Sequence, residues 1–150
     1  MASEDEAARL AWLSYTWASD FQVIQTTGEA MPESHRRASE SESVVQRQLD
    51  AYNAHDLDSF VATYSDEVEI FRLPSTVAAL SGKQELREFY QKSRFNLPAL
   101  HAVLLHRSVV GNRVIDHERI VGLGAEPVET VAEYLVQDGL IQKVWLRSGS

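Results

Sequence analysis

The chain has 150 residues, a formal net charge of −8 and no cysteine. This length fits one domain with a sizeable core, and the lack of cysteine excludes disulfides, thiolate metal sites and cysteine nucleophiles. Because phosphate binding needs a basic face, the charge argues against a nucleic-acid partner. There is no apolar run of about 20 residues to span a membrane, and residues 3–6 are acidic where a secretory leader is basic. We therefore expect no membrane partner and a cytoplasmic location.

The first 38 residues are predicted to form an extension of the main domain. Residues 4–25 carry apolar side chains three and four positions apart, at Leu10, Leu13, Trp17, Phe21 and Ile24. This spacing predicts an amphipathic helix that docks on its own domain or on a second subunit. Residues 26–43 are rich in Ser, Glu and Arg and predict a linker, in which Met31 is a second candidate start. We accordingly divide the chain into residues 1–38, helix and linker, and residues 39–150, the main domain.

Three helices are predicted in the first half of the main domain. A helix that begins at Ser39 is broken at residues 53–55, Asp56 caps a short second helix, and Ser81 caps a third. Residues 68–71 alternate between apolar and charged side chains and predict a short strand before the third helix.

After Pro98 the hydrophobic period changes from that of helices to that of strands. Four strands are predicted, over residues 101–110, 113–121, 130–137 and 140–147. The pairs Gly111-Asn112 and Asp138-Gly139 suit tight turns and predict two hairpins. Helices followed by antiparallel strands are typical of the α+β class.

Four segments of the main domain resemble the nuclear transport factor two-like superfamily. They are QRQLDAYNAHDLDSF (46–60), GKQELREFY (82–90), VVGNRVIDHERIVG (109–122) and VETVAEYLVQDGLIQKVWL (128–146). The last two are similar to its SnoaL-like and ketosteroid-isomerase-like branch. The resemblance covers roughly residues 42–147. It implies a cystatin-like fold, in which a cone-shaped, curved antiparallel sheet is wrapped by three helices around a pocket; the N-terminal extension adds one helix.

The same resemblance implies several properties of the protein. Members of the superfamily include isomerases, dehydratases, cyclases, epoxide hydrolases and non-catalytic modules, and they commonly form homodimers. As a rule they need neither a metal nor an organic cofactor. Since one fold hosts many functions, the activity has to be argued from the residues of the site.

The residues that ketosteroid isomerases use are not matched in this chain. Aligning Asp66 and Glu67 with the acidic pair before the catalytic strand of those enzymes puts Arg72 at the position of their carboxylate base. Arginine stays protonated and cannot remove a proton. The position of their catalytic tyrosine falls at about Gln48, one turn before Tyr52. We therefore do not expect steroid isomerisation itself.

The turn at Gly111-Asn112 predicts the register of the hairpin around it. It pairs Arg107 with Asp116, Leu105 with Glu118, and His106 with His117. Paired residues share a face of the sheet, so Arg107, Asp116 and Glu118 are expected on one face and both histidines on the other. The apolar neighbours expected beside the arginine are Val103, Leu105, Val109, Val114 and Ile120, with Leu104 on the histidine face.

Arg107, Asp116 and Glu118 form the predicted catalytic set. The arginine would hold Asp116 ionised, while apolar surroundings raise the pKa of Glu118. The two carboxyl groups would then divide the roles of base and acid. Epoxide hydrolases of the superfamily use a loosely similar Asp-Arg-Asp set. The alternative is an ordinary cross-strand ion pair on a solvated or dimer-facing surface.

His117 is a second candidate base, next to His106 across the hairpin. Imidazole titrates near neutral pH, and dehydratases of this fold use histidine with aspartate. The alternatives are a partly buried pair or a contact between subunits. No third ligand occurs at a suitable spacing, so we predict no metal site.

Five residues are predicted to contact the ligand, namely Arg72, Tyr52, Tyr90, His101 and Phe71. Arg72 and His101, with Arg94, would place positive charge at the pocket mouth, although Arg72 has Glu69 as an alternative partner. The aromatic residues would line the pocket or fill the core. We expect a small-molecule-pocket protein with cofactor-free acid–base chemistry of the isomerase, dehydratase, cyclase or hydrolase type on an apolar, oxygenated ligand. The alternative is a non-catalytic ligand-binding or dimerisation module.

Overall fold

The computed structural model describes residues 32–149, and the predicted helix over residues 4–25 lies outside them. The described elements are α2 (Glu33–Asn53), α3 (Leu57–Val61), β1 (Tyr64–Arg72), β2 (Ala78–Ser81), α4 (Lys83–Ser93), β3 (His101–Val110), β4 (Arg113–Val121), β5 (Val128–Gln137) and β6 (Leu140–Ser148). None of these helices is long and apolar enough to cross a membrane.

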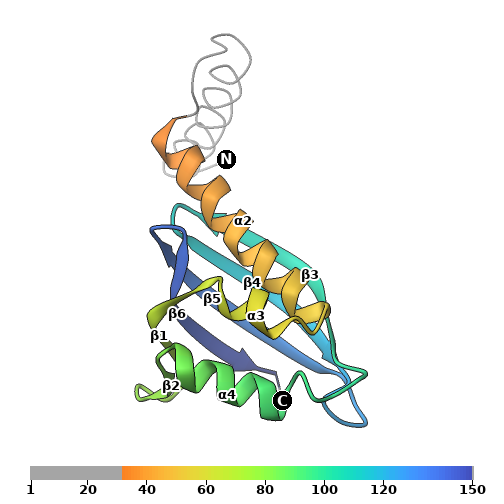
Figure 1. Ribbon diagram of the computed structural model, residues 1–150. Helices are drawn as coiled ribbons and strands as arrows, with labels where there is room; N and C mark the ends of the chain where they lie inside the picture. Colours follow the sequence, from red (N-terminus) through yellow and green to blue (C-terminus); the bar gives the residue numbers. More distant parts are fainter. Residues whose placement is uncertain (1–31, 150) are drawn as a thin grey trace, which may run out of the picture. The chain divides into compact units, whose positions relative to one another are not determined.

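The six strands form one curved, unclosed sheet in the order β2-β1-β6-β5-β4-β3 (Figure 1). Neighbouring strands run antiparallel, except that β1 and β6 are parallel. The helices lie on one face of the sheet, and the core fills the space between them and that face. The predicted fold class, a curved α+β sheet wrapped by three helices, is confirmed.

Helix α2 begins at Glu33, six residues before the predicted start at Ser39. The linker predicted over residues 26–43 is therefore wrong from residue 33 onward. The polar composition that predicted a linker belongs to the exposed face of a helix, while Ser41 on the other face is buried and donates its hydroxyl to the Arg37 carbonyl at 2.7 Å. The division of the chain at residue 38 stays a prediction.

The break after α2 is fixed by side chains that bond to the edge strand β3. The Asn53 amide donates to the Ala102 carbonyl at 2.9 Å and accepts from the Ala102 backbone nitrogen at 2.8 Å. Nε2 of His55 bonds to the Leu100 carbonyl at 2.7 Å. Asp56 then caps α3, accepting from the Ser59 nitrogen, as predicted. These contacts hold the end of α2 against β3.

The predicted cap at Ser81 is wrong. Ser81 is the last residue of the short strand β2, which the sequence pattern did not predict, and Gly82 with φ 90° precedes α4 instead. The backbone nitrogen of Ser81 bonds to the Glu85 carboxylate at 3.2 Å. A residue whose own backbone is paired in a strand cannot also begin the helix, which is why the predicted capping box fails.

Both predicted hairpins are present. Val110 pairs with Arg113 across the Gly111-Asn112 turn, and Asp138 and Gly139 both have positive φ, as a tight two-residue turn requires. The strands β3 and β4 have the predicted bounds. The register predicted around Gly111-Asn112 is correct as far as the pair His106–His117.

Beyond that pair, an irregularity at Leu105 shifts the register of β3. Leu104, and not Leu105, lies opposite Glu118. Because a shift of one residue exchanges the two faces of a strand, Leu104 turns toward the core, while Val103 and Leu105 are each 41% exposed. The predicted faces of these three residues are therefore wrong.

A fully buried carboxylate stands among the largest fully buried side chains of the domain. These are Tyr64, Phe60, Ile70, Leu86, Ile141, Val45, Val68, Val114 and Asp116. A charged side chain with 0% exposure is costly unless it is paired and hydrogen-bonded. The partners of Asp116 therefore matter for the stability of the domain.

Gly122, which follows β4, allows the backbone to pass close to Ala99, and substituting it tests the packing of the domain. A Cβ atom at Gly122, whose φ is +85°, would lie 2.3 Å from the carbonyl of Ala99. We expect Gly122→Ala to lower the free energy of unfolding by about 3 kcal/mol or more, because strain and overlap add. Gly124→Ala, with open space around it, should change it by less than about 1 kcal/mol. Equal effects in urea unfolding would contradict the packing.

Candidate functional site

A cavity of about 90 Å³ lies between α2, α4 and the inner face of the sheet. Its polar lining consists of Gln48, Tyr52, Arg72, Tyr90, Arg94, Glu118, Thr130, Tyr134 and Ser148. Its apolar lining consists of Leu49, Ile120, Leu123, Val128, Ala132 and Leu146. Glu118 is the one carboxyl side chain that the described residues contribute to this lining.

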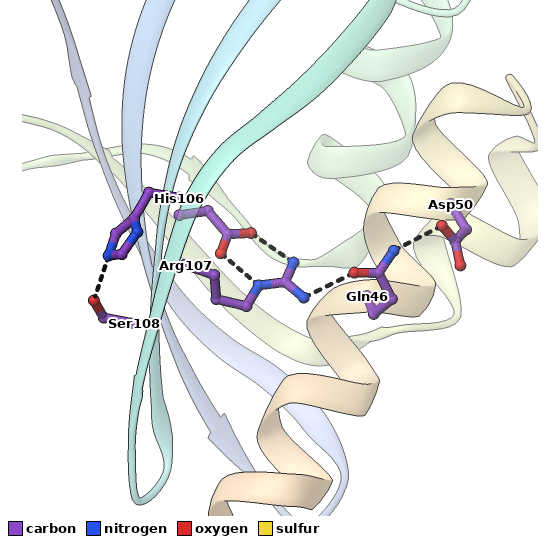
Figure 2. A network of polar contacts seen from close by, with 6 residues as sticks. Gln46, Asp50, His106, Arg107 and Ser108 are labelled. Carbon is purple, nitrogen blue, oxygen red and sulfur yellow. Dashed lines mark hydrogen bonds and ion pairs between the residues drawn. The ribbon is translucent and has the colours of Figure 1, made fainter.

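Arg107 and Asp116 form a buried, bidentate ion pair across β3 and β4. Nε and one terminal nitrogen of the arginine donate to the two carboxylate oxygens at 2.7 and 2.9 Å, and the side chains are 8% and 0% exposed. The remaining terminal nitrogen donates to Gln46 of α2 at 2.8 Å (Figure 2). The predicted pairing is present, and its burial excludes the alternative of a solvated surface pair.

Glu118 follows Asp116 on the same face of β4 and is 6% exposed. Burial, together with the nearby Asp116 carboxylate, raises the pKa of Glu118 to about 7, and the Arg107 charge only partly opposes this. One of its carboxyl oxygens, Oε1, is buried without a hydrogen-bond partner. The side chain therefore exchanges its proton near neutral pH.

The three predicted catalytic residues lie together in the structure, but only Glu118 lines the cavity. Both oxygens of Asp116 accept from Arg107, and Asp116 is not among the lining residues. Arg107 instead borders a shallow groove along α2. Asp116 and Arg107 thus lie beside Glu118 but outside the lining of this cavity.

His117 lies on the opposite face of the sheet from the cavity and does not line it. Its Nε2 is 3.1 Å from the Glu129 carboxylate, and its side chain is 41% exposed. His106 lies on the same outer face, where it bonds to Ser108, while Arg107 points from the other side of β3 toward α2 (Figure 2). Alternation along a strand separates them. Residues 32–149 contain no cluster of acids and histidines able to hold a metal.

Three of the five predicted ligand contacts line the cavity, namely Tyr52, Arg72 and Tyr90. Phe71 and His101 do not line this cavity. Phe71 stacks on Trp145 at a centroid distance of 6.0 Å, because it alternates with Arg72 and faces the other way. His101 is exposed at the start of β3, where the inward position belongs to the buried Ala102.

Two lining residues that the sequence analysis missed, Thr130 and Tyr134, come from β5. Thr130 lies opposite Glu118, and Tyr134 lies opposite Val114. Cross-strand partners share a face, so pairing β5 with β4 by alternation is the signal that would have found them.

Three of the residues that line the cavity are tyrosines. Burial raises the pKa of Tyr52, Tyr90 and Tyr134 above the ordinary value for a phenol, so that each hydroxyl keeps its proton at neutral pH. Arg94 and Arg72 oppose this rise at Tyr90. The cavity thus combines one titrating carboxyl group with several protonated phenols.

The ion pair should be essential for stability. Arg107→Met leaves the Asp116 carboxyl group without its partner in the core, and we expect the free energy of unfolding to fall by about 3–5 kcal/mol. The matched control is Arg113→Met, which breaks an ion pair of the same 2.7 Å length at the surface and should cost less than about 1 kcal/mol. Similar losses for both variants in urea unfolding would contradict the role given to burial.

Glu118 should make stability depend on pH. Its pKa of about 7 in the folded protein lies above the value of 4.5 for a free side chain, so the folded state binds more protons between these values and stability falls as pH rises from about 4.5 to 7. Glu118→Gln removes this dependence. Relative to Glu118→Gln, the wild-type protein should lose about 2–3 kcal/mol between pH 4 and pH 8. A constant difference across unfolding curves at both pH values would contradict the assignment.

Comparison with known proteins gives a family and a fold. The SnoaL-like domain family matches residues 45–144, whereas no curated protein matches the chain. Solved structures with the same fold include a candidate ketosteroid isomerase from Kribbella flavida, with 19% identity, a TM-score of 0.66, and coverage of 75% of this chain and 80% of that one.

Two further structures show the same likeness. An NTF2-like protein of unknown function from Mesorhizobium loti has 19% identity and a TM-score of 0.66, and the alignment covers 76% of this chain and 94% of that one. A candidate polyketide cyclase from Sinorhizobium meliloti has 16% identity and a TM-score of 0.60, with 69% and 93% covered. Identities this low show the fold alone. With the family match over most of the main domain, the chain belongs to the SnoaL-like domain family of the NTF2-like superfamily.

Proposed function

We propose that this protein binds a compact, oxygenated small molecule in the cavity and catalyses a proton transfer on it without a cofactor. The observation that supports this proposal is Glu118, a buried carboxyl group in the cavity lining with a pKa of about 7. A group with a pKa near the working pH is present in both forms, which is what general acid–base catalysis requires.

A single carboxyl group favours an isomerisation among the reactions expected from the sequence. The ionised Glu118 removes a proton from a carbon next to a carbonyl group and returns it to another atom of the same ligand, so that no further reactant is needed. The hydroxyl groups of Tyr52 and Tyr90, which line the same cavity, donate to the oxygen on which negative charge develops. Hydrolysis would require a second group to activate water.

Asp116 and Arg107 support this chemistry as positioning residues. The Asp116 charge helps to keep the pKa of Glu118 high, and Arg107 holds Asp116 in place. Steroid-sized ligands are disfavoured, since sites for drug-sized ligands have volumes of about 300–1,000 Å³ and this cavity has about 90 Å³.

The second candidate function is a non-catalytic ligand-binding module of the same fold. It is favoured by the fact that Asp116, paired with Arg107, lies outside the cavity lining, so that Glu118 has no second carboxyl group beside it there among the described residues. The two candidates share the cavity and differ in whether Glu118 exchanges a proton with the ligand. The homodimer and the cytoplasmic location expected from the sequence stay predictions.

Hydrogen–deuterium exchange on bound ligands separates the two functions. Small carbonyl compounds that raise the melting temperature are incubated with the protein in D₂O, and exchange of their C–H protons is followed by NMR. We expect Glu118→Gln to slow the exchange by about 10²-fold or more, and the wild-type rate to rise with pH to a plateau above about 7, as the carboxylate base forms.

Glu133→Gln is the matched control, because Glu133 lies in the exposed pair with Arg113, outside the cavity lining. It should leave the exchange rate unchanged. Ligands that bind without exchange in the wild-type protein, or equal rates in the wild type and Glu118→Gln, would refute catalysis by Glu118 and favour the binding module.

A further inference from the structure

Two arginines of the cavity lining share one aromatic ring. Arg72 ends β1, and Arg94 follows the last residue of α4. Their guanidinium carbons lie 5.5 and 4.9 Å from the centroid of Phe89, and both side chains line the cavity. Two like charges are thus gathered at the same part of the cavity wall.

Neither guanidinium forms an ion pair with a carboxylate among residues 32–149. Glu69, the partner that the sequence suggested for Arg72, pairs with Lys143 at 3.7 Å instead. Within the described part of the chain, the Arg94 guanidinium donates one hydrogen bond, to the neighbouring Ser93 carbonyl. Because guanidinium groups present several donors that fit a carboxylate, this part of the wall is suited to an anion.

Two residues of the cavity lining have side-chain oxygens that lack hydrogen-bond donors. Oε1 of Gln48 and Oε1 of Glu118 are buried without a hydrogen-bond partner, and both residues are 6% exposed. The amide nitrogen of Gln48 is already committed to the Tyr64 hydroxyl at 3.1 Å. A buried oxygen without a donor is costly, and a ligand hydroxyl group would supply one.

We propose that the cavity binds a small hydroxycarboxylate. Its carboxylate is held by Arg72 and Arg94, and its hydroxyl group bonds to Gln48 or Glu118. Three features of the cavity indicate this ligand class. The two arginines suit an anionic group, and the two oxygens without donors suit a hydroxyl group. The volume of about 90 Å³ suits a ligand of few atoms. This inference rests on the proposed function only in placing the ligand in the same cavity.

Titration calorimetry with three probes of nearly equal size tests the proposal. Lactate has both groups, propionate lacks the hydroxyl group and propane-1,2-diol lacks the carboxylate. We expect the full-length protein to bind lactate more tightly than either, and Arg72→Gln or Arg94→Gln to weaken lactate about tenfold or more. Arg113→Gln, which removes a guanidinium over Trp145 on the outer face, should leave lactate binding unchanged. Melting temperatures confirm that each variant is folded.

Three results would overturn the proposal. The first is that lactate at millimolar concentration does not bind, and the second is that lactate and the diol bind equally tightly. The third is that Arg113→Gln loses as much affinity for lactate as Arg72→Gln and Arg94→Gln. Proton exchange in Glu118→Gln tests the proposed function, whereas lactate binding by the arginine variants tests this inference, so failure of one can be distinguished from failure of the other. Lactate binding that depends on Arg72 and Arg94 supports the anion site whether or not Glu118→Gln slows proton exchange, and that exchange alone decides catalysis.

Discussion

The buried ion pair between Arg107 and Asp116 is the constraint on which the rest of the site depends. A carboxylate with no exposed surface is tolerated only because both of its oxygens accept from one guanidinium group. The same guanidinium reaches Gln46, and so ties α2 to the sheet. With Asp116 paired to Arg107 outside the cavity lining, Glu118 is the carboxyl group of the described residues that lines the cavity, beside a negative charge that helps to keep it protonated.

The cavity then has two chemically different parts. Arg72 and Arg94 supply positive charge over Phe89, whereas Glu118 lies among buried tyrosines whose hydroxyl groups stay protonated. A ligand anchored by its anionic end is held in one orientation against the titrating carboxyl group. Such positioning is a large part of what a small catalytic site contributes, because it replaces a chance encounter with a fixed geometry.

The α+β class and the ion pair could be predicted from hydrophobic periodicity and local turn chemistry, whereas the curved sheet wrapped by helices was implied by the family resemblance. Gly111-Asn112 sets the register that brings Arg107 opposite Asp116, and alternation puts Glu118 on the same face. The irregularity at Leu105 has no sequence signal, so the faces of Val103 and Leu104 were wrong. Phe71 and His117 were assigned to the pocket by residue type, although alternation turns both outward. Thr130 and Tyr134 share a face with the inward residues of β4 once β5 is paired with β4, a pairing that the two predicted hairpins did not include.

The central claim is that burial keeps Glu118 protonated up to neutral pH. The most direct measurement is the ionisation of this side chain, followed by NMR of ¹³C-labelled glutamate carboxyl groups and assigned by the signal that disappears in Glu118→Gln. The account predicts a midpoint at about pH 7. A midpoint near 4.5, the value of an unperturbed side chain, would contradict it.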